Sequence, residues 1–198
     1  MRIALIGGAG FLVHHLALRL RGAGHDVAVV DALGVNNFGN LLERRNGNWA
    51  EHYLRMVDDR FRLLAAAGCC YRHCDARDYH RLSRVLAEWR ADAIVHLAAV
   101  AHITVTRLDQ HLAWENSILT LKNALDVAVA VGCKHFVYIS SSTVYGDFKK
   151  PVLDEEDALD PDTTYGSFKA MGEGMVQSWH RDRGLSYTII RPQALYGP

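Results

Sequence analysis

Short apolar runs alternate with longer amphipathic segments along most of the chain. The runs predict strands at residues 3–6, 25–31, 70–75, 93–99, 134–140 and 185–190. Apolar residues at spacings of three and four predict helices at 12–22, 49–67, 77–89, 109–131 and 164–183. Buried strands that alternate with helices are typical of a parallel sheet covered by helices on both faces. The pattern therefore predicts an α/β, doubly wound domain.

The first predicted strand runs into a glycine turn and then a helix, in the stretch MRIALIGGAGFLV. Gly7 can form the tight turn, and Gly10 lets a pyrophosphate approach the backbone. The helix after Gly10 begins with free N–H groups and the positive end of its dipole, both of which attract phosphate. This order predicts the start of a dinucleotide-binding βαβ unit, although a glycine loop alone is weak evidence.

The second predicted strand ends in an acidic residue, Asp31, about twenty residues after the glycine loop. At this spacing a carboxylate can accept hydrogen bonds from the adenosine ribose hydroxyls. An acidic residue at a strand end is ordinary on its own, but after the glycine loop it favours a ribose contact. A carboxylate also repels a 2′-phosphate, so the sequence predicts NAD rather than NADP.

Charge and composition narrow the class of protein. The 22 Lys and Arg balance the 22 Asp and Glu, which gives no sign of nucleic-acid or membrane binding. The four cysteines lack paired metal-ligand spacings and are predicted to be reduced and mostly buried. The apolar run before Gly7 is too short for a signal peptide, and no apolar stretch reaches membrane-spanning length. A cytoplasmic protein without a bound metal is expected.

Residues 32–68 form a longer connection than a strand–helix turn needs. Turn-forming residues mark its first part, at Asn36, Asn37, Gly39, Asn46, Gly47 and Asn48. The predicted helix that follows has a charged side, and a solvated face is the simpler interpretation. A dimer contact or a substrate contact is the alternative.

Two polar stretches in the second half could carry chemistry. Residues 140–146, SSSTVYG, follow the fifth predicted strand, where open α/β sheets bind ligands. Tyr165 and Lys169 lie four residues apart and so share one face of the next helix. An ammonium beside a phenol favours the phenolate, and an oxidised nicotinamide adds a second positive charge. Together they predict a lowered pKa for Tyr165 and a role as general acid or base. Ser141 could hydrogen-bond the same substrate oxygen.

Together these motifs resemble the extended short-chain dehydrogenase/reductase family, in its NAD-dependent epimerase/dehydratase group. The resemblance covers essentially the whole chain. It rests on GGAGFL at 7–12, Asp31, CDARD at 74–78, HLAA at 96–99, SSSTVYG at 140–146, YGSFK at 165–169 and RPQALYGP at 191–198. It implies a Rossmann-type fold with NAD along the strand ends, a nucleotide-sugar substrate and a homodimer.

The resemblance also implies roles for single residues. Ser141, Tyr165 and Lys169 match the catalytic triad, and Lys169 could also reach ribose hydroxyls of NAD. The implied cofactor contacts are Gly7, Gly10, Phe11, Leu12, Asp31, Asp75, Ala76, Leu97, Ala98, Ala99, Tyr165 and Lys169. Within this set Asp75 and Ala76 resemble the adenine-edge contacts, and residues 97–99 resemble the segment under the adenosine and pyrophosphate.

Four places depart from the family pattern. Val13 replaces the third glycine, which predicts a first helix slightly further from the sheet. Leu119 replaces the glycine of an Asn-x-x-Gly-Thr motif. Ser142 and Thr143 replace the Asp-Glu pair that 4,6-dehydratases need for water elimination. Ala194 replaces a substrate-contacting Asn of many epimerases, which weakens a transfer of their specificity.

Three histidines are weaker candidates. His15, on the first predicted helix, matches a histidine common in the family and is predicted to be packed. His96 ends the fourth strand, where a structural hydrogen bond is favoured over catalysis. His102 follows that strand and could contact substrate.

Family members continue well beyond a Tyr-Gly-Pro run like residues 196–198. We therefore interpret residues 1–198 as an NAD-binding Rossmann domain, the N-terminal part of a longer architecture whose substrate domain is largely absent. A naturally short protein is the alternative.

Three functions remain open at this point. The first is an NAD-dependent epimerase acting on a nucleotide-activated sugar by transient hydride transfer. The second is an NAD-dependent reductase or dehydrogenase of the same family, favoured by Ala194 and by the missing Asp-Glu pair. The third is a non-catalytic NAD-binding protein, with residues 36–68 as a partner surface.

Overall fold

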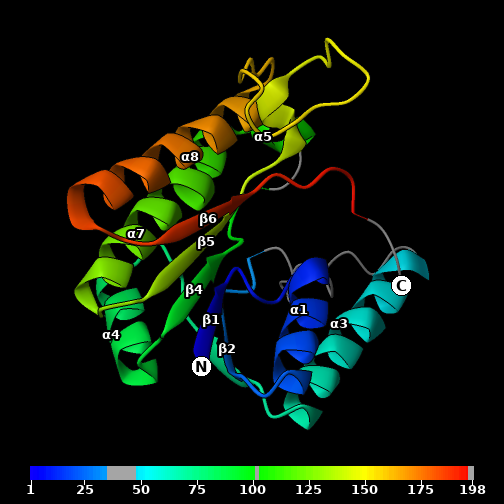
Figure 1. Cartoon of the computed structure of the whole chain (residues 1–198). Helices are drawn as coiled ribbons and strands as arrows, with labels where there is room; N and C mark the ends of the chain where they lie inside the picture. Colours follow the sequence, from blue (N-terminus) through cyan, green and yellow to red (C-terminus); the bar gives the residue numbers. More distant parts are fainter. Residues whose placement is uncertain (35–47, 101–102, 196–198) are drawn as a thin grey trace.

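Six parallel strands form one sheet in the order β3-β2-β1-β4-β5-β6, as Figure 1 shows. The structure is a computed structural model that describes residues 1–34, 48–100 and 103–195. The strands are β1 Arg2–Ile6, β2 Asp26–Asp31, β3 Cys70–His73, β4 Ala93–His96, β5 His135–Ile139 and β6 Tyr187–Ile190. The strand order reverses between β1 and β4, where a crevice is expected beyond the carboxyl ends of the strands. The predicted doubly wound α/β fold is confirmed.

Alternation along the strands divides the core into two layers. In β1, Ile3 and Leu5 pack in one buried cluster, while Ala4 and Ile6 pack in the other. Such strands have no solvent-exposed face, which explains why their sequences are continuous apolar runs.

Helices cover both faces of the sheet (Figure 1). The helices on one face are α1 Phe11–Gly22 and α3 Asn48–Ala66. Those on the other are α4 Tyr79–Trp89, α7 Thr120–Ala130 and α8 Thr164–Arg183. Helix α8 lies close to the sheet because Gly172 has no side chain, and a Cβ there would collide with the Tyr138 hydroxyl of β5. This contact fixes how near the tyrosine-bearing helix can come to the strands.

The segment predicted as one helix at 109–131 is helical over residues 110–130, with a π turn inside it. It contains α6 Gln110–Trp114, a π-helical turn η1 Glu115–Leu119 and then α7, and a further helix, α5 Ile103–Leu108, precedes it. Two side chains of the π turn region bond to the backbone four residues earlier, Asn116 Nδ2 to the Leu112 carbonyl and Thr120 Oγ1 to the Asn116 carbonyl. Such turns insert one extra residue and often lie at functional sites, which apolar periodicity does not reveal.

Smaller differences concern element ends. Strand β3 ends at His73, two residues before Asp75, and α4 begins at Tyr79 because the Asp78 side chain caps it by accepting from Arg81 N at 3.0 Å. Asn48 begins α3 rather than marking a turn. The other predicted turn residues lie outside the described residues: Asn36, Asn37, Gly39, Asn46 and Gly47. His102 and the run at 196–198 lie outside them as well. Among the described helices, none has the length and apolarity to cross a bilayer.

Candidate active site

The glycine loop between β1 and α1 lies against the end of β4. Gly7 has a φ of +83°, and a Cβ there would come within 2.5 Å of the Ala98 backbone nitrogen. Either condition favours glycine, and together they exclude other residues. The Gly7 N–H donates to the Val30 carbonyl at 2.9 Å. Residues 97–99 are half-buried and continue from β4 past this turn, where Leu97 N–H donates to the Ile6 carbonyl at 2.8 Å.

Gly10 leaves space for a ligand rather than for the protein. Its φ of −77° suits any residue, and a Cβ there would meet only the Gly7 carbonyl oxygen, at 3.9 Å. Phe11 and Leu12 occupy the next two positions, at the first turn of α1, where backbone N–H groups lack helical acceptors. An anion in front of Gly10 would therefore meet free N–H donors and no side chain. The pyrophosphate of a dinucleotide fits this cradle.

Val13 fills the position of the family's third glycine. Its side chain is 2 % exposed and packs in the core layer between α1 and the first two strands. The valine thus contributes to the contact between α1 and the sheet instead of leaving a gap there.

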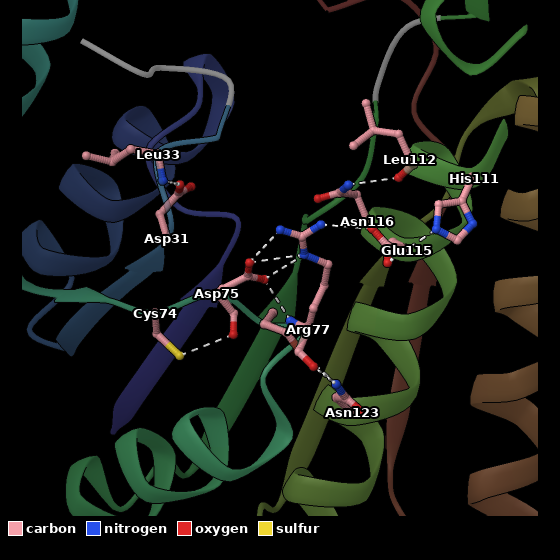
Figure 2. A network of polar contacts seen from close by, with 11 residues as sticks. Asp31, Leu33, Cys74, Asp75, Arg77, His111, Leu112, Glu115, Asn116 and Asn123 are labelled. Atoms are coloured by element: carbon pink, nitrogen blue, oxygen red, sulfur yellow. Dashed lines mark hydrogen bonds and ion pairs between the residues drawn. The ribbon is translucent and has the colours of Figure 1, made fainter. Parts of the chain in front are cut away.

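Asp31 braces the glycine loop from the end of β2. Its Oδ2 accepts from Ala9 N at 2.8 Å. Its Oδ1 accepts from Leu33 N at 2.6 Å (Figure 2). Each carboxylate oxygen can accept a further hydrogen bond. The half-buried carboxylate can therefore hold the loop and still bind ribose hydroxyls.

An ionic network surrounds Asp75 (Figure 2). Arg77 Nη2 donates to Asp75 Oδ2 at 2.7 Å, and Arg77 Nη1 donates to Glu115 Oε2 in the π turn at 3.0 Å. The hydrogen bonds from Arg77 hold the pKa of the Asp75 carboxyl below its usual range. Asn123 of α7 pins the same loop by donating to the carbonyls of Ala76 and Arg77 at 3.0 and 2.9 Å. The structure thus anchors both predicted adenine-edge residues, through partners that the sequence analysis did not single out.

Ser141, Tyr165 and Lys169 come together at the carboxyl end of β5. Ser141 caps the 3-10 turn η2 Ser142–Tyr145, and its Oγ accepts from Thr143 N at 3.3 Å. Tyr165 lies in the first turn of α8, and the Ser141 side chain acts to lower the pKa of its phenol. Lys169 is 4 % exposed, and its Nζ donates to the Ile139 carbonyl at 2.7 Å.

The pKa of Tyr165 differs from the prediction. Burial raises it above its ordinary value, and the hydrogen bond with Ser141 opposes only part of that rise. Burial also lowers the pKa of Lys169 to about 8, against the attraction of Glu173. The Lys169 Nζ lies 5.9 Å from the centroid of the Tyr165 ring. The predicted lowering is therefore wrong for the protein alone, because burial of the phenol outweighs the opposing effect of Ser141 on its pKa.

Two histidine predictions are also corrected. His15 is exposed, and its neighbour His14 is the buried one. His96 is fully buried, but neither ring nitrogen has a hydrogen-bond partner at ordinary distance among the described residues. Its ring is stacked with Phe136 and tilted against Tyr138, with ring centroids 6.3 and 6.1 Å away. Burial lowers the pKa of His96 to about 3, so this histidine is neutral at ordinary pH.

All four cysteines are free thiols. Cys74 and Cys133 are buried, whereas Cys69 and Cys70 are half-buried. Burial raises the pKa of Cys74 to about 11, which makes it a poor nucleophile. Within the described residues, His, Cys, Asp and Glu side chains form no group of three that could hold a metal ion.

Glu173 and Arg191 are further polar residues of the site that the sequence analysis did not single out. Glu173 lies four residues after Lys169, so it continues the helical face that carries Tyr165 and Lys169. That spacing was a visible signal. Arg191 begins the RPQALYGP motif, but its pairing with Glu173 was not visible in the sequence, because only the fold brings the end of β6 to this helix.

Comparison with known proteins identifies the family of this site. Residues 3–198 match the family model described as "NAD dependent epimerase/dehydratase family". The chain belongs to this family. The resemblance seen in the sequence is thereby confirmed.

Several members of the epimerase/dehydratase family are similar to the chain. It is 33% identical over 179 residues to UDP-glucose 4-epimerase 2 of Oryza sativa subsp. japonica, covering 90% of the chain and 40% of that protein. It is 29% identical over 191 residues to UDP-glucose 4-epimerase of Lacticaseibacillus casei, covering 96% and 50%. The crystal structure of Thermus thermophilus UDP-glucose 4-epimerase with NAD superposes with a TM-score of 0.79 at 25% identity, covering 96% and 54%. The chain thus spans about half the length of these relatives.

Proposed function

We propose that the chain is the NAD-binding and catalytic part of an epimerase that acts on a nucleotide-activated sugar. The observation that carries this proposal is the grouping of Ser141, Tyr165 and Lys169 at the carboxyl end of β5. The similarity to UDP-glucose 4-epimerases supports this function over others in the family.

The described residues fit NAD. Gly10 leaves the space that a pyrophosphate needs, and Phe11 and Leu12 offer backbone donors beside it. Asp31 keeps acceptor capacity for ribose hydroxyls, and its charge disfavours the 2′-phosphate of NADP. When bound, NAD supplies the hydride acceptor and a positively charged ring.

The proposed chemistry uses three side chains. Tyr165 removes the proton of a sugar hydroxyl as the hydride leaves the same carbon, while Ser141 hydrogen-bonds that oxygen. With NAD bound, the hydride taken up by the cofactor would return to the opposite face of the rotated keto sugar, and Tyr165 would give the proton back to the sugar oxygen. Since burial alone raises the pKa of Tyr165, the phenolate depends on the nearby Lys169 ammonium and on the positive charge that the cofactor brings.

Replacing Tyr165 with Phe in the whole protein tests this role. We expect kcat for sugar epimerisation to fall by about 10²- to 10⁴-fold, because the proton acceptor is lost, while NAD affinity is largely retained. Tyr187→Phe is the matched control, since this phenol lies in β6. Unchanged turnover in Tyr165→Phe would remove the assigned role.

A reductase or dehydrogenase of the same family is the second candidate. Ala194 favours it, because an Asn that contacts substrate in many epimerases is replaced there. Retained NAD with no net redox change supports the epimerase. Stoichiometric consumption of exchangeable NAD(H) supports the reductase.

We also propose that two copies of the protein associate. Helices α5, α6 and α8 contact one another. They carry exposed apolar side chains, among them Ile103, Leu108, Leu112, Trp114 and Met171. Trp114 lies edge-on to Phe168, with ring centroids 5.9 Å apart, and this contact joins α6 to α8. Exposed apolar surface of this kind is typical of protein interfaces.

A further inference from the structure

A buried ion pair joins helix α8 to the end of β6, close to the candidate catalytic residues. Glu173 is 1 % exposed and follows Lys169 by one helical turn. Arg191 binds both of its carboxylate oxygens, with Nε to Oε1 at 2.9 Å and Nη2 to Oε2 at 2.7 Å. This two-point contact fixes orientation as well as distance, because the guanidinium and the carboxylate are both planar.

Further hydrogen bonds link the pair to the segments that carry the site. The buried Ser140 hydroxyl, adjacent to Ser141, donates to Glu173 Oε1 at 2.5 Å. Arg191 Nη1 donates to the Tyr145 hydroxyl oxygen at 2.6 Å and to the Glu155 carbonyl at 2.8 Å. The strand exit, the 3-10 turn, the following loop and α8 therefore all meet at one ion pair.

We propose that Glu173 and Arg191 are positioning residues that hold Ser141 in register with Tyr165 and Lys169. This inference rests on the proposed function of that site. Helix α8 is tied to the exit of β5 at two successive points, Lys169 to the Ile139 carbonyl and Glu173 to Ser140. Loss of the second tie leaves the catalytic helix free to shift against the strand that carries the serine.

The pair also sets the charge around Lys169. The titratable groups that face this ammonium are Glu173 and Tyr165 on α8, Tyr138 on β5 and His96 on β4. Among these four, Glu173 is the group whose attraction raises the pKa of Lys169 against the effect of burial. Glu173 therefore helps keep Lys169 protonated, as a partner for the Tyr165 phenolate must be.

Kinetics of Glu173→Gln in the whole protein test the positioning role. We expect kcat to fall by about 10- to 100-fold with little change in the KM for the sugar, because the reacting groups lose their register. Glu173→Asp, which keeps the charge, is expected to recover part of this loss. Val176→Ala is the matched control, since it removes buried volume from the same helix without touching the ion pair.

A second readout does not require activity. The pKa of Lys169, followed by NMR of ¹³Cε-labelled lysine and assigned with Lys169→Met, is expected to fall by about 1 unit in Glu173→Gln. Val176→Ala should leave it unchanged. An unaltered pKa of Lys169 in Glu173→Gln, or an equal loss of kcat in Val176→Ala, would overturn the proposal.

Ser140→Ala covers the case in which Glu173→Gln does not fold, because it leaves the ion pair intact. We expect it to lower kcat several-fold with the pKa of Lys169 unchanged, and a wild-type kcat would contradict the positioning role. Failure of the proposed function has a different signature. In that case the wild-type protein epimerises no nucleotide sugar, while the pKa of Lys169 still responds to Glu173→Gln.

Discussion

At the scale of single residues, two glycines of the cofactor loop differ in whether the protein's own packing requires them. Gly7 is required by the protein itself, since its φ is positive and a Cβ would collide with the backbone of Ala98. Gly10 has ordinary backbone angles and open space around it, so packing within the protein does not require a missing side chain there. The spacing of the two glycines is visible in sequence, but their separate reasons are not.

Gly10→Ala should therefore affect binding more than folding. We expect NAD affinity, measured by calorimetry, to fall at least about tenfold, while the free energy of unfolding changes by less than about 1 kcal/mol. Gly174→Ala is the control, because Gly174 is exposed in α8 with nothing near its Cβ position. That change should stabilise the protein by about 0.5–1 kcal/mol and leave NAD affinity unchanged. Equal NAD affinity in Gly10→Ala would place the pyrophosphate elsewhere.

His96 makes stability depend on pH. Its pKa is about 3 in the folded protein and about 6.5 in an unfolded chain, so the unfolded chain binds the extra proton between these values. The contribution of neutral His96 to the free energy of unfolding is therefore fully present above pH 6.5. It is lost as the pH falls, by up to about 1.4 kcal/mol for each pH unit. In urea unfolding between pH 4 and 7, the free energy of unfolding should change less steeply with pH in His96→Leu than in the wild-type protein. The exposed His80→Leu should keep the wild-type slope, and identical slopes for both variants would contradict this account.

At the scale of elements, apolar periodicity predicted every strand and most helices. It predicted the helical segment 109–131 but not the π turn within it, which depends on hydrogen bonds of Asn116 and Thr120 to backbone carbonyls. Element ends depended likewise on single polar side chains. Asp109 accepts from Leu112 N at 2.8 Å and so begins α6.

Helix α8 shows how one element combines local and distant information. The spacing of Tyr165, Lys169 and Glu173 follows from helical geometry and is readable in sequence. The electrostatics did not follow from that spacing, because the pKa values of Tyr165 and Lys169 depend first on burial. Burial is decided by the strands and loops that pack against the helix.

At the scale of the whole molecule, self-association through α5, α6 and α8 is open to direct measurement. Sedimentation equilibrium of the whole protein is expected to give twice the mass of one copy. Leu108→Asp combined with Met171→Asp should yield single copies, because charges replace apolar side chains on the shared surface; Leu108 is 82 % exposed within one copy. Val152→Asp, an exposed apolar position in the loop before α8, is the control and should leave the mass unchanged. A wild-type protein that sediments as one copy would contradict the association.

The sequence by itself determined the fold class, the order of the elements and the motifs of the family. These follow from apolar periodicity, turn residues and fixed spacings, which are properties of neighbours along the chain. Only the tertiary structure decided the ion pair of Arg77 with Glu115, the neutral state of His96 and the pairing of Glu173 with Arg191. Each of these depends on burial or on a partner from another element, and packing alone brings such groups together.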